Sequence, residues 1–200
     1  MNDKILIIAN GPSILNHNFS AEIDKFQEVA RINNFRIDGF EKHIGSKTTI
    51  WFNGGNQNLK KPNFYPKEII VFIPYEILER KEQKVKKKLP IRLGISSDDY
   101  IVVKKEKMKE YQDKSKIKRP TTGFNSILWA VDNYKEVIIH GFDFFQDSKE
   151  HYYDSYIMKK ISNLKIMRKG QKHDNIGEKF FIQSLINKNK VIELSNFLKR

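Results

Sequence analysis

The sequence predicts an α/β protein whose mostly parallel sheet carries helices on both faces. Short apolar runs recur along the 200 residues, and most of them lack the polar alternation of a strand with one wet face. Helical patterns lie between several of these runs. Polar loops rich in Asn and Gly follow several of the runs directly, at the edge where parallel sheets bind their ligands.

The first half of the chain contains four predicted strands. They are short runs of apolar, β-branched and aromatic residues, at 4–9, 29–32, 47–52 and 68–73. Gly, Pro or Asn follows each run and ends it. Residues 14–25 show a weaker pattern, which predicts a short helix or an irregular segment.

The second half alternates between helical patterns and apolar runs. The charged stretch 75–119 predicts one helix at about 75–88 and a short strand at 100–103. After it we expect a helix at 124–133, a strand at 136–141, a helix at 175–187 and a final strand at 191–194. Asn175 and Glu178 have the spacing of a capping box at the start of the last helix.

The polar loops that follow the strands are expected to converge. They contain Asn10-Gly11-Pro12-Ser13, Asn33-Asn34, Asn53-Gly54-Gly55 and Gly141-Phe142-Asp143. Because parallel strands end at one edge of a sheet, these loops predict a shared crevice. Gly11 lets the backbone approach a ligand closely, and the side chains of Asn10 and Ser13 offer hydrogen bonds. Taken alone, this first loop fits a plain change of direction equally well.

Composition limits the classes of protein that fit. The chain contains no Cys, which excludes disulfides and indicates a reducing compartment. No apolar stretch approaches the ~20 residues of a membrane span, and the amino terminus lacks a signal-peptide pattern. We therefore expect one cytoplasmic domain over residues 1–200. A lid insertion is expected at about 145–172, where polar and aromatic residues lack a strong core pattern.

The formal charge of +13 predicts an anionic partner. The excess gathers at residues 80–88 and 104–119, which we interpret as solvated helix faces and loops rather than a nucleic-acid groove. The chain carries no motif that combines basic residues with stacking aromatics, so nucleic acid is not the expected partner. A phosphate-bearing substrate or the inner face of an anionic membrane remains open, and so does a homo-oligomer.

Six stretches, taken together, resemble the bacterial sialyltransferases that use CMP-sialic acid, glycosyltransferase family 42. They are Ile8–Ser13, Arg31–Phe35, Trp51–Asn53, Arg119–Gly123, Gly141–Phe144 and His173. They occur in the family's order with similar spacing and cover most of the chain. The resemblance implies a Rossmann-like, GT-A-like single nucleotide-binding domain with a small lid. It also implies inverting transfer with neither a metal ion nor another cofactor.

The resemblance assigns donor or acceptor contacts to a set of polar and glycine positions. The set is Asn10, Gly11, Ser13, Asn33, Asn53, Arg119, Thr121, Thr122, Gly123, Asp143, His151 and Tyr152. The three asparagines would bind CMP, and Asp143 would accept hydrogen bonds from the ribose or the base. Thr121–Gly123 stand at a helix start, where free N–H groups favour an anion. Arg119 would support the acceptor or an anionic group.

His173 would be the general base, because an imidazole that titrates near neutrality suits deprotonation of an acceptor hydroxyl. Without the resemblance, a surface His beside a helix explains it as well. His140 lies inside a strand and is expected to be structural, whereas His17 and His43 are expected at the surface. No His and carboxylate spacing predicts a metal site.

The chain departs from the family at two positions, where tyrosines would steady the leaving phosphate. Phe145 stands at the first and His151 at the second, with Tyr152 and Tyr153 adjacent. A protonated His151 can replace a phenol, or either tyrosine can shift into place; packing of the lid explains these residues equally well.

The leading hypothesis is a glycosyltransferase. It would move sialic acid or a related nonulosonic acid from its CMP form to a hydroxyl of a surface glycan such as lipooligosaccharide or capsule. The alternatives are a transferase for another CMP-sugar such as CMP-Kdo, a non-catalytic nucleotide- or glycan-binding relative, and last a nucleic-acid-binding protein.

Overall fold

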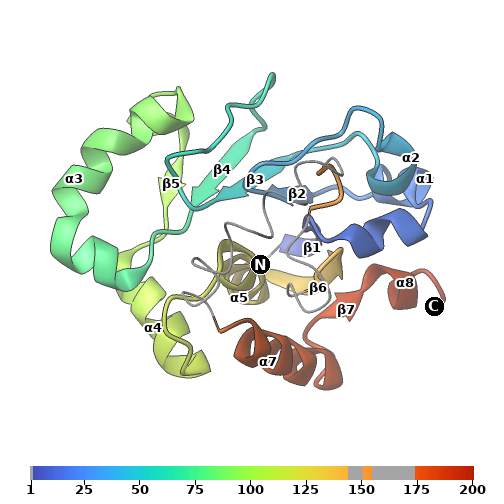
Figure 1. Cartoon of the computed structure of the whole chain (residues 1–200). Helices are drawn as coiled ribbons and strands as arrows, with labels where there is room; N and C mark the ends of the chain where they lie inside the picture. Colours follow the sequence, from blue (N-terminus) through green and yellow to red (C-terminus); the bar gives the residue numbers. More distant parts are fainter. Residues whose placement is uncertain (1, 144–150, 155–173) are drawn as a thin grey trace.

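The computed structural model describes residues 2–143, 151–154 and 174–200, and these residues contain one seven-stranded sheet (Figure 1). The strands are β1 (Asn2–Ile8), β2 (Val29–Ile32), β3 (Ile50–Asn53), β4 (Glu68–Val71), β5 (Ile101–Val102), β6 (Tyr134–His140) and β7 (Ile192–Glu193). Their order across the sheet is β5-β4-β3-β2-β1-β6-β7, and every pairing is parallel. The α/β class with a parallel sheet is confirmed.

Helices and 3-10 turns connect these strands. They are η1 (Pro12–Asn16), α1 (Ser20–Ile23), α2 (Glu41–Ile44), α3 (Tyr75–Leu93), η2 (Ser97–Asp99), α4 (Lys105–Ser115), α5 (Thr122–Asn133), α7 (Asn175–Asn187) and α8 (Leu194–Phe197). Figure 1 shows α3 and α4 at the β5 end of the sheet, and α7 and α8 at the β7 end.

The sheet separates two apolar cores. On β1, Ile5 and Ile7 belong to the larger core with residues of α3, α4, α5 and α7, whereas Leu6 and Ile8 belong to the smaller one. Residues of η1, α1, α2 and α8 complete the smaller core. Because successive side chains of a strand point to opposite faces, an unbroken apolar run is what a strand covered on both sides needs.

The strand order reverses beside β1. The chain proceeds outward through β2, β3 and β4 to β5, and then returns to place β6 against the free side of β1. Such a reversal opens a crevice at the carboxyl ends of the two strands on either side of it. The loops after β1 and β6 therefore face each other, and Gly11 N–H donates to the Gly141 carbonyl at 2.9 Å.

Several predicted elements differ from the structure in extent. The run 47–52 differs in its bounds, because β3 spans Ile50–Asn53; the Thr49 hydroxyl, just before it, accepts a hydrogen bond from Val29 N–H. Helix α3 extends to Leu93, with a kink at Lys81, and α4 was not predicted. The predicted capping box is also wrong: Asp174 caps α7 by accepting from Gly177 N–H. The predicted lid lies mostly outside the described residues.

Candidate functional site

A cavity of about 120 Å³ lies at the reversal point of the sheet. Its walls come from the loops after β1, β2 and β6, from the start of α5 and from α7. The lining residues are Ala9, Asn10, Gly11, Ile32, Asn33, Thr121, Thr122, Gly123, Phe124, Gly141, Phe142, Asp143, His151 and Glu178. Eight positions expected to bind substrate thus meet here, namely Asn10, Gly11, Asn33, Thr121, Thr122, Gly123, Asp143 and His151.

Asn10 connects the loop after β1 to the loop after β2, and one polar atom of its side chain has no hydrogen-bond partner among the described residues. Its Nδ2 donates to the carbonyl oxygens of Ile32 and Asn34, at 2.9 Å each. Two acceptors on one side fix the orientation of the amide. Its Oδ1 is buried and has no hydrogen-bond partner among the described residues. A buried carbonyl oxygen in that condition is costly, so a ligand that donates a hydrogen bond is favoured here.

Asn33 and Asn53 hold the loop that follows β3. Asn33 has a left-handed backbone (φ 51°), and its Oδ1 accepts from Gly54 N–H at 3.0 Å. Asn53 is fully buried, and its Oδ1 accepts from Gly55 N–H at 3.0 Å. Asn33 therefore lies at the cavity wall, whereas Asn53 is buried and does not line the cavity.

The start of α5 forms another part of the cavity wall. Thr121 is the N-cap: its hydroxyl accepts from Phe124 N–H at 3.1 Å. The N–H groups of Thr122 and Gly123 belong to the first turn of the helix, which supplies them with no carbonyl partner. They line the cavity, so this wall presents hydrogen-bond donors and the positive end of a helix dipole.

Glu178 fixes Thr121 from α7. One carboxylate oxygen accepts from Thr121 N–H and the other from the Thr121 hydroxyl, both at 2.6 Å. Glu178 is only 3% exposed, and this burial raises its pKa to about 7, although the bonds from Thr121 oppose the rise. The sequence interpretation gave Glu178 a local capping role, because its real partner lies 57 residues away in the chain.

Asp143 ties the loop after β6 to the loop after β1. Its carboxylate accepts from Ser13 N–H at 2.9 Å and from the Ser13 hydroxyl. A Cβ added to Gly11 would overlap this carboxylate and lie 2.6 Å from the Gly141 carbonyl oxygen. Only glycine fits there without displacing either group. Ser13 itself lines a neighbouring cavity rather than the one shared by Asn10 and Thr121.

The segment 151–154 covers the cavity beside Asn10. Tyr152 N–H donates to the Asn10 carbonyl at 3.1 Å. His151 lines the cavity and stacks on the Tyr153 ring, with centroids 5.2 Å apart. Burial lowers the pKa of His151, against the opposing influence of Asp154, so the neutral imidazole is favoured at pH 7. The idea of a charged His151 in place of a phenol therefore finds no support in this geometry.

The hydroxyls of both tyrosines are already bonded elsewhere. Tyr152 is 5% exposed; its hydroxyl donates to the Arg36 carbonyl and accepts from Arg36 N–H at 3.0 Å. The Tyr153 hydroxyl donates to the Asn34 carbonyl at 2.8 Å. Tyr152 thus anchors this segment to the loop after β2 and does not line the cavity.

The other predicted positions lie around the cavity or outside the described residues. Arg119 is exposed, adopts a left-handed backbone (φ 52°) and does not line the cavity. His173 and Phe145 lie outside the described residues. Within the described ranges, no group of three or more His, Asp or Glu side chains is placed to hold a metal ion.

A larger cavity of about 620 Å³ adjoins the first along Gly141–Asp143 and is bounded by η1, α7 and β7. His140 lines it and is 7% exposed. Its Nε2 has no hydrogen-bond partner among the described residues, and burial lowers its pKa to about 4. Within the described part of the chain, His140 therefore makes no hydrogen bond at this nitrogen. His17 is exposed, as expected, whereas His43 is half-buried and bonds the His17 carbonyl through Nδ1.

In chemical terms, the site combines uncharged hydrogen-bonding groups with an anion-favouring helix start. Amides and backbone groups can recognise a base or ribose, and the α5 terminus can stabilise a phosphate or carboxylate. These are the requirements of a nucleotide ester.

The chain matches the sequence profile of glycosyltransferase family 29 (sialyltransferase) over residues 4–76 and 73–190. It is 24% identical over 219 residues to a type 2 lactosamine α-2,3-sialyltransferase of Rattus norvegicus, covering 96% of this chain and 64% of the rat protein. It is 25% identical over 175 residues to a β-1,6-galactosyltransferase of Arabidopsis thaliana, covering 74% of this chain and 44% of that protein. The chain therefore spans less than two thirds of the length of either relative.

Solved sialyltransferases share the fold. A mammalian sialyltransferase aligns with a TM-score of 0.73 at 18% identity, covering 96% of this chain and 69% of the other. The sialyltransferase CstII of Campylobacter jejuni, solved with the substrate analogue CMP-3FNeuAc, aligns with a TM-score of 0.63 at 18% identity, covering 97% and 82%. The matching profile is that of family 29, not family 42, to which the six stretches were likened; sialyltransferase is the class common to both.

Proposed function

The chain belongs to glycosyltransferase family 29, the sialyltransferases, and on that premise we propose that it transfers sialic acid or a related nonulosonic acid from its CMP form to a glycan hydroxyl. The acceptor oxygen forms a bond to the anomeric carbon while the bond from that carbon to the CMP phosphate oxygen breaks. His173 takes the hydroxyl proton, CMP leaves, and the configuration inverts. We propose that the reaction needs no metal ion.

One observation supports the proposal: Asn10, whose Oδ1 is buried and without a hydrogen-bond partner among the described residues, lines the same small cavity as the first turn of α5. One residue with a spare acceptor for a base or ribose donor group and a helix start with donors for an anion thus line a single cavity. CMP carries both kinds of group. The first turn of α5 would stabilise the negative charge that develops on the departing phosphate, because its N–H groups are already oriented before the reaction.

The direct test is calorimetric titration with CMP, followed by assays of CMP-sialic acid hydrolysis and transfer to lactose and N-acetyllactosamine. The wild-type chain is expected to bind CMP and to turn over the donor. Asn10→Leu is expected to weaken CMP binding about tenfold, since the substitution removes a hydrogen bond in a desolvated site. His173→Ala is expected to retain CMP binding and to lose transfer by about 10²–10⁴-fold.

Other results would change the proposed activity, the proposed sugar or the proposed base. Binding of CMP without turnover of CMP-sialic acid or CMP-Kdo would identify a non-catalytic relative. Turnover of CMP-Kdo alone would change the sugar, and transfer that persists in His173→Ala would remove the base assigned here. Failure to bind CMP would exclude the proposal as a whole.

We also propose that the enzyme docks on the cytoplasmic face of an anionic membrane, where lipid-linked or surface-glycan acceptors are assembled. Exposed lysines of α3 and α4 support this, because basic side chains are attracted to anionic headgroups. Among the described residues, no helix has both the length and the apolarity to cross a bilayer. Co-sedimentation with phosphatidylglycerol vesicles at low salt, and loss of it with phosphatidylcholine alone, is the expected result.

A further inference from the structure

We call the 120 Å³ cavity the donor cavity, after the CMP-sugar that we propose binds there. A second groove, of about 480 Å³, shares the lining residue Asn33 with it. We name it the β2–β3 groove: its walls are residues 33–38, which follow β2, and 60–64, which follow β3. Trp51 and Thr48 form its floor. Asn33 lines both this groove and the donor cavity, so a molecule lying in the groove comes close to the donor.

The two walls of the groove are hydrogen-bonded to each other and to the loop that follows β1. Asn34 Oδ1 accepts from Lys60 N–H at 2.7 Å, and Asn34 Nδ2 donates to the Asn58 carbonyl at 3.1 Å. The Asn34 carbonyl accepts from Asn10 Nδ2. Trp51 Nε1 donates to the Asn33 carbonyl at 2.7 Å. The groove is therefore built by the same backbone that builds the donor cavity, which makes it a formed site rather than a surface irregularity.

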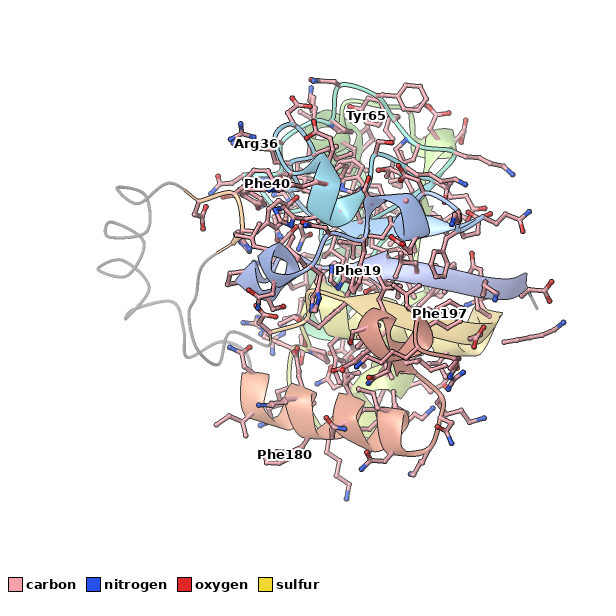
Figure 2. The ribbon with its side chains drawn as sticks, turned by 90° about the vertical axis from the view of Figure 1, so that its right-hand side faces the viewer. Phe19, Arg36, Phe40, Tyr65, Phe180 and Phe197 are labelled. Carbon is pink, nitrogen blue, oxygen red and sulfur yellow. The ribbon has the colours of Figure 1, made fainter. Side chains whose placement is uncertain are left out.

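Cations outnumber anions along this groove. Arg36, Lys60 and Lys61 line it against a single carboxylate, that of Asp38, and all four residues are exposed. Figure 2 shows Arg36 at the outer edge of the molecule, near Phe40. The Arg36 guanidinium lies over the Phe40 ring, 5.6 Å from its centroid. A surface of this charge favours an anionic ligand over a neutral one.

Aromatic rings stand among these cations. Phe64 is 81% exposed on the 60–64 wall, and Phe35 lies on the opposite wall with the Arg31 guanidinium 5.7 Å from its ring centroid. Ring faces offer flat apolar surfaces, while the polar groups around them offer hydrogen bonds. Sugars present both an apolar C–H face and hydroxyls, so this combination suits a glycan.

We propose that the β2–β3 groove is the acceptor subsite and that it selects acceptors carrying a phosphate or carboxylate close to the accepting hydroxyl. The inference rests on the proposed function for its link to transfer. Lys60 and Lys61 attract the charged group, Phe64 stacks on a sugar ring, and Asn33 marks the junction with the donor. The first turn of α5 remains the site of the donor's own anion.

The experiment measures binding by calorimetry in the presence of CMP, so it does not require turnover. The probes are lactose, a phosphorylated lactose, and a disaccharide of galactose and glucuronic acid. The phosphorylated or the carboxylated probe is expected to bind about tenfold more tightly than lactose at low salt, and the preference is expected to shrink as salt rises. Comparison of the two charged probes identifies which anion is preferred.

Variants locate the site. The double substitution Lys60→Gln and Lys61→Gln is expected to remove the preference for the charged probe while leaving lactose and CMP binding unchanged. Lys67→Gln removes an exposed lysine outside the groove and serves as the matched control. Phe64→Ala is expected to weaken all three disaccharides.

Equal affinity for the neutral and charged probes, no binding of any probe, or a preference that survives the double substitution would each overturn the proposal. CMP affinity, measured separately, reports on the donor site. A chain that binds CMP but shows no groove effect disproves the subsite alone, whereas a chain that does not bind CMP disproves the proposed function.

Discussion

The carboxylate of Glu178 holds both the backbone N–H and the hydroxyl of Thr121, at 2.6 Å each. This pairing fixes the N-cap of α5 from a separate helix, α7. The cap in turn positions the first turn that lines the donor cavity. A buried acid is thus part of the support for the anion-favouring wall, although no interaction with a ligand is assigned to it.

Glu178→Gln is expected to change the pH dependence of stability. Because the folded pKa of about 7 lies above the ordinary 4.5, the folded state favours the protonated acid. That stabilisation is complete below pH 4.5 and is lost as pH rises through 7, by up to about 3 kcal/mol. Subtracting the unfolding free energies of the variant from those of the wild type across pH 4–8 is the measurement. A flat difference would contradict the assignment.

Gly11→Ala is expected to disrupt the junction of the β1 and β6 loops. The new methyl group would overlap the Asp143 carboxylate and press on the Gly141 carbonyl. We expect a loss of about 1–3 kcal/mol of stability, as overpacking typically costs, and a CMP affinity at least about tenfold weaker.

Gly39→Ala is the matched control for that prediction. Gly39 has a φ of 81°, yet an added Cβ meets nothing within 4 Å. The Gly39→Ala variant should lose about 1 kcal/mol of folding stability through backbone strain alone and should keep its CMP affinity. If both variants bind CMP like the wild type, close packing at Gly11 does not shape the donor cavity.

His140→Phe tests the buried imidazole beside the larger cavity. The folded pKa of about 4 lies below the ordinary 6.5, so the unfolded chain binds a proton more readily. The neutral ring contributes stability above pH 6.5 that is lost as pH falls through 4, by up to about 3 kcal/mol. Acid unfolding followed by circular dichroism should show this loss in the wild type but not in the variant; parallel curves would refute it.

Much of the sheet could be predicted because its strands are covered on both faces. The run at 68–73 stands out by its apolar residues, and the structure pairs Glu68–Val71. The run at 29–32 is recognisable despite Arg31, and the structure pairs Val29–Ile32. Helix α4 could not be found in this way. Only Met108 and Tyr111 are buried on it, and its remaining positions are mostly charged. A helix that contributes so little to the core carries a weak periodic signal.

The part of the candidate site that could be predicted is the part that the order and direction of the strands bring together. Asn10, Asn33 and Asp143 meet because parallel strands end at one edge. The sequence could not show which side chains line the cavity and which only hold the lining residues in place. Asn53 carries the same amide as Asn10, but it is the last residue of the fully buried strand β3, and its Oδ1 accepts from Gly55 N–H. The roles of Glu178 and Asn53 depend on partners that only the folded chain brings within reach.

The pairing of β1 with β6 has a consequence for how this protein is made. Residues 2–8 are synthesised well before residues 134–140, which form the strand that completes their pairing. The central strand therefore remains with one side unprotected while more than half of the chain is synthesised. Contacts between such distant segments slow folding and leave strand edges exposed to neighbouring chains. Vectorial synthesis thus completes the middle of the sheet only after the strands β2 to β5 on one side of it have been made.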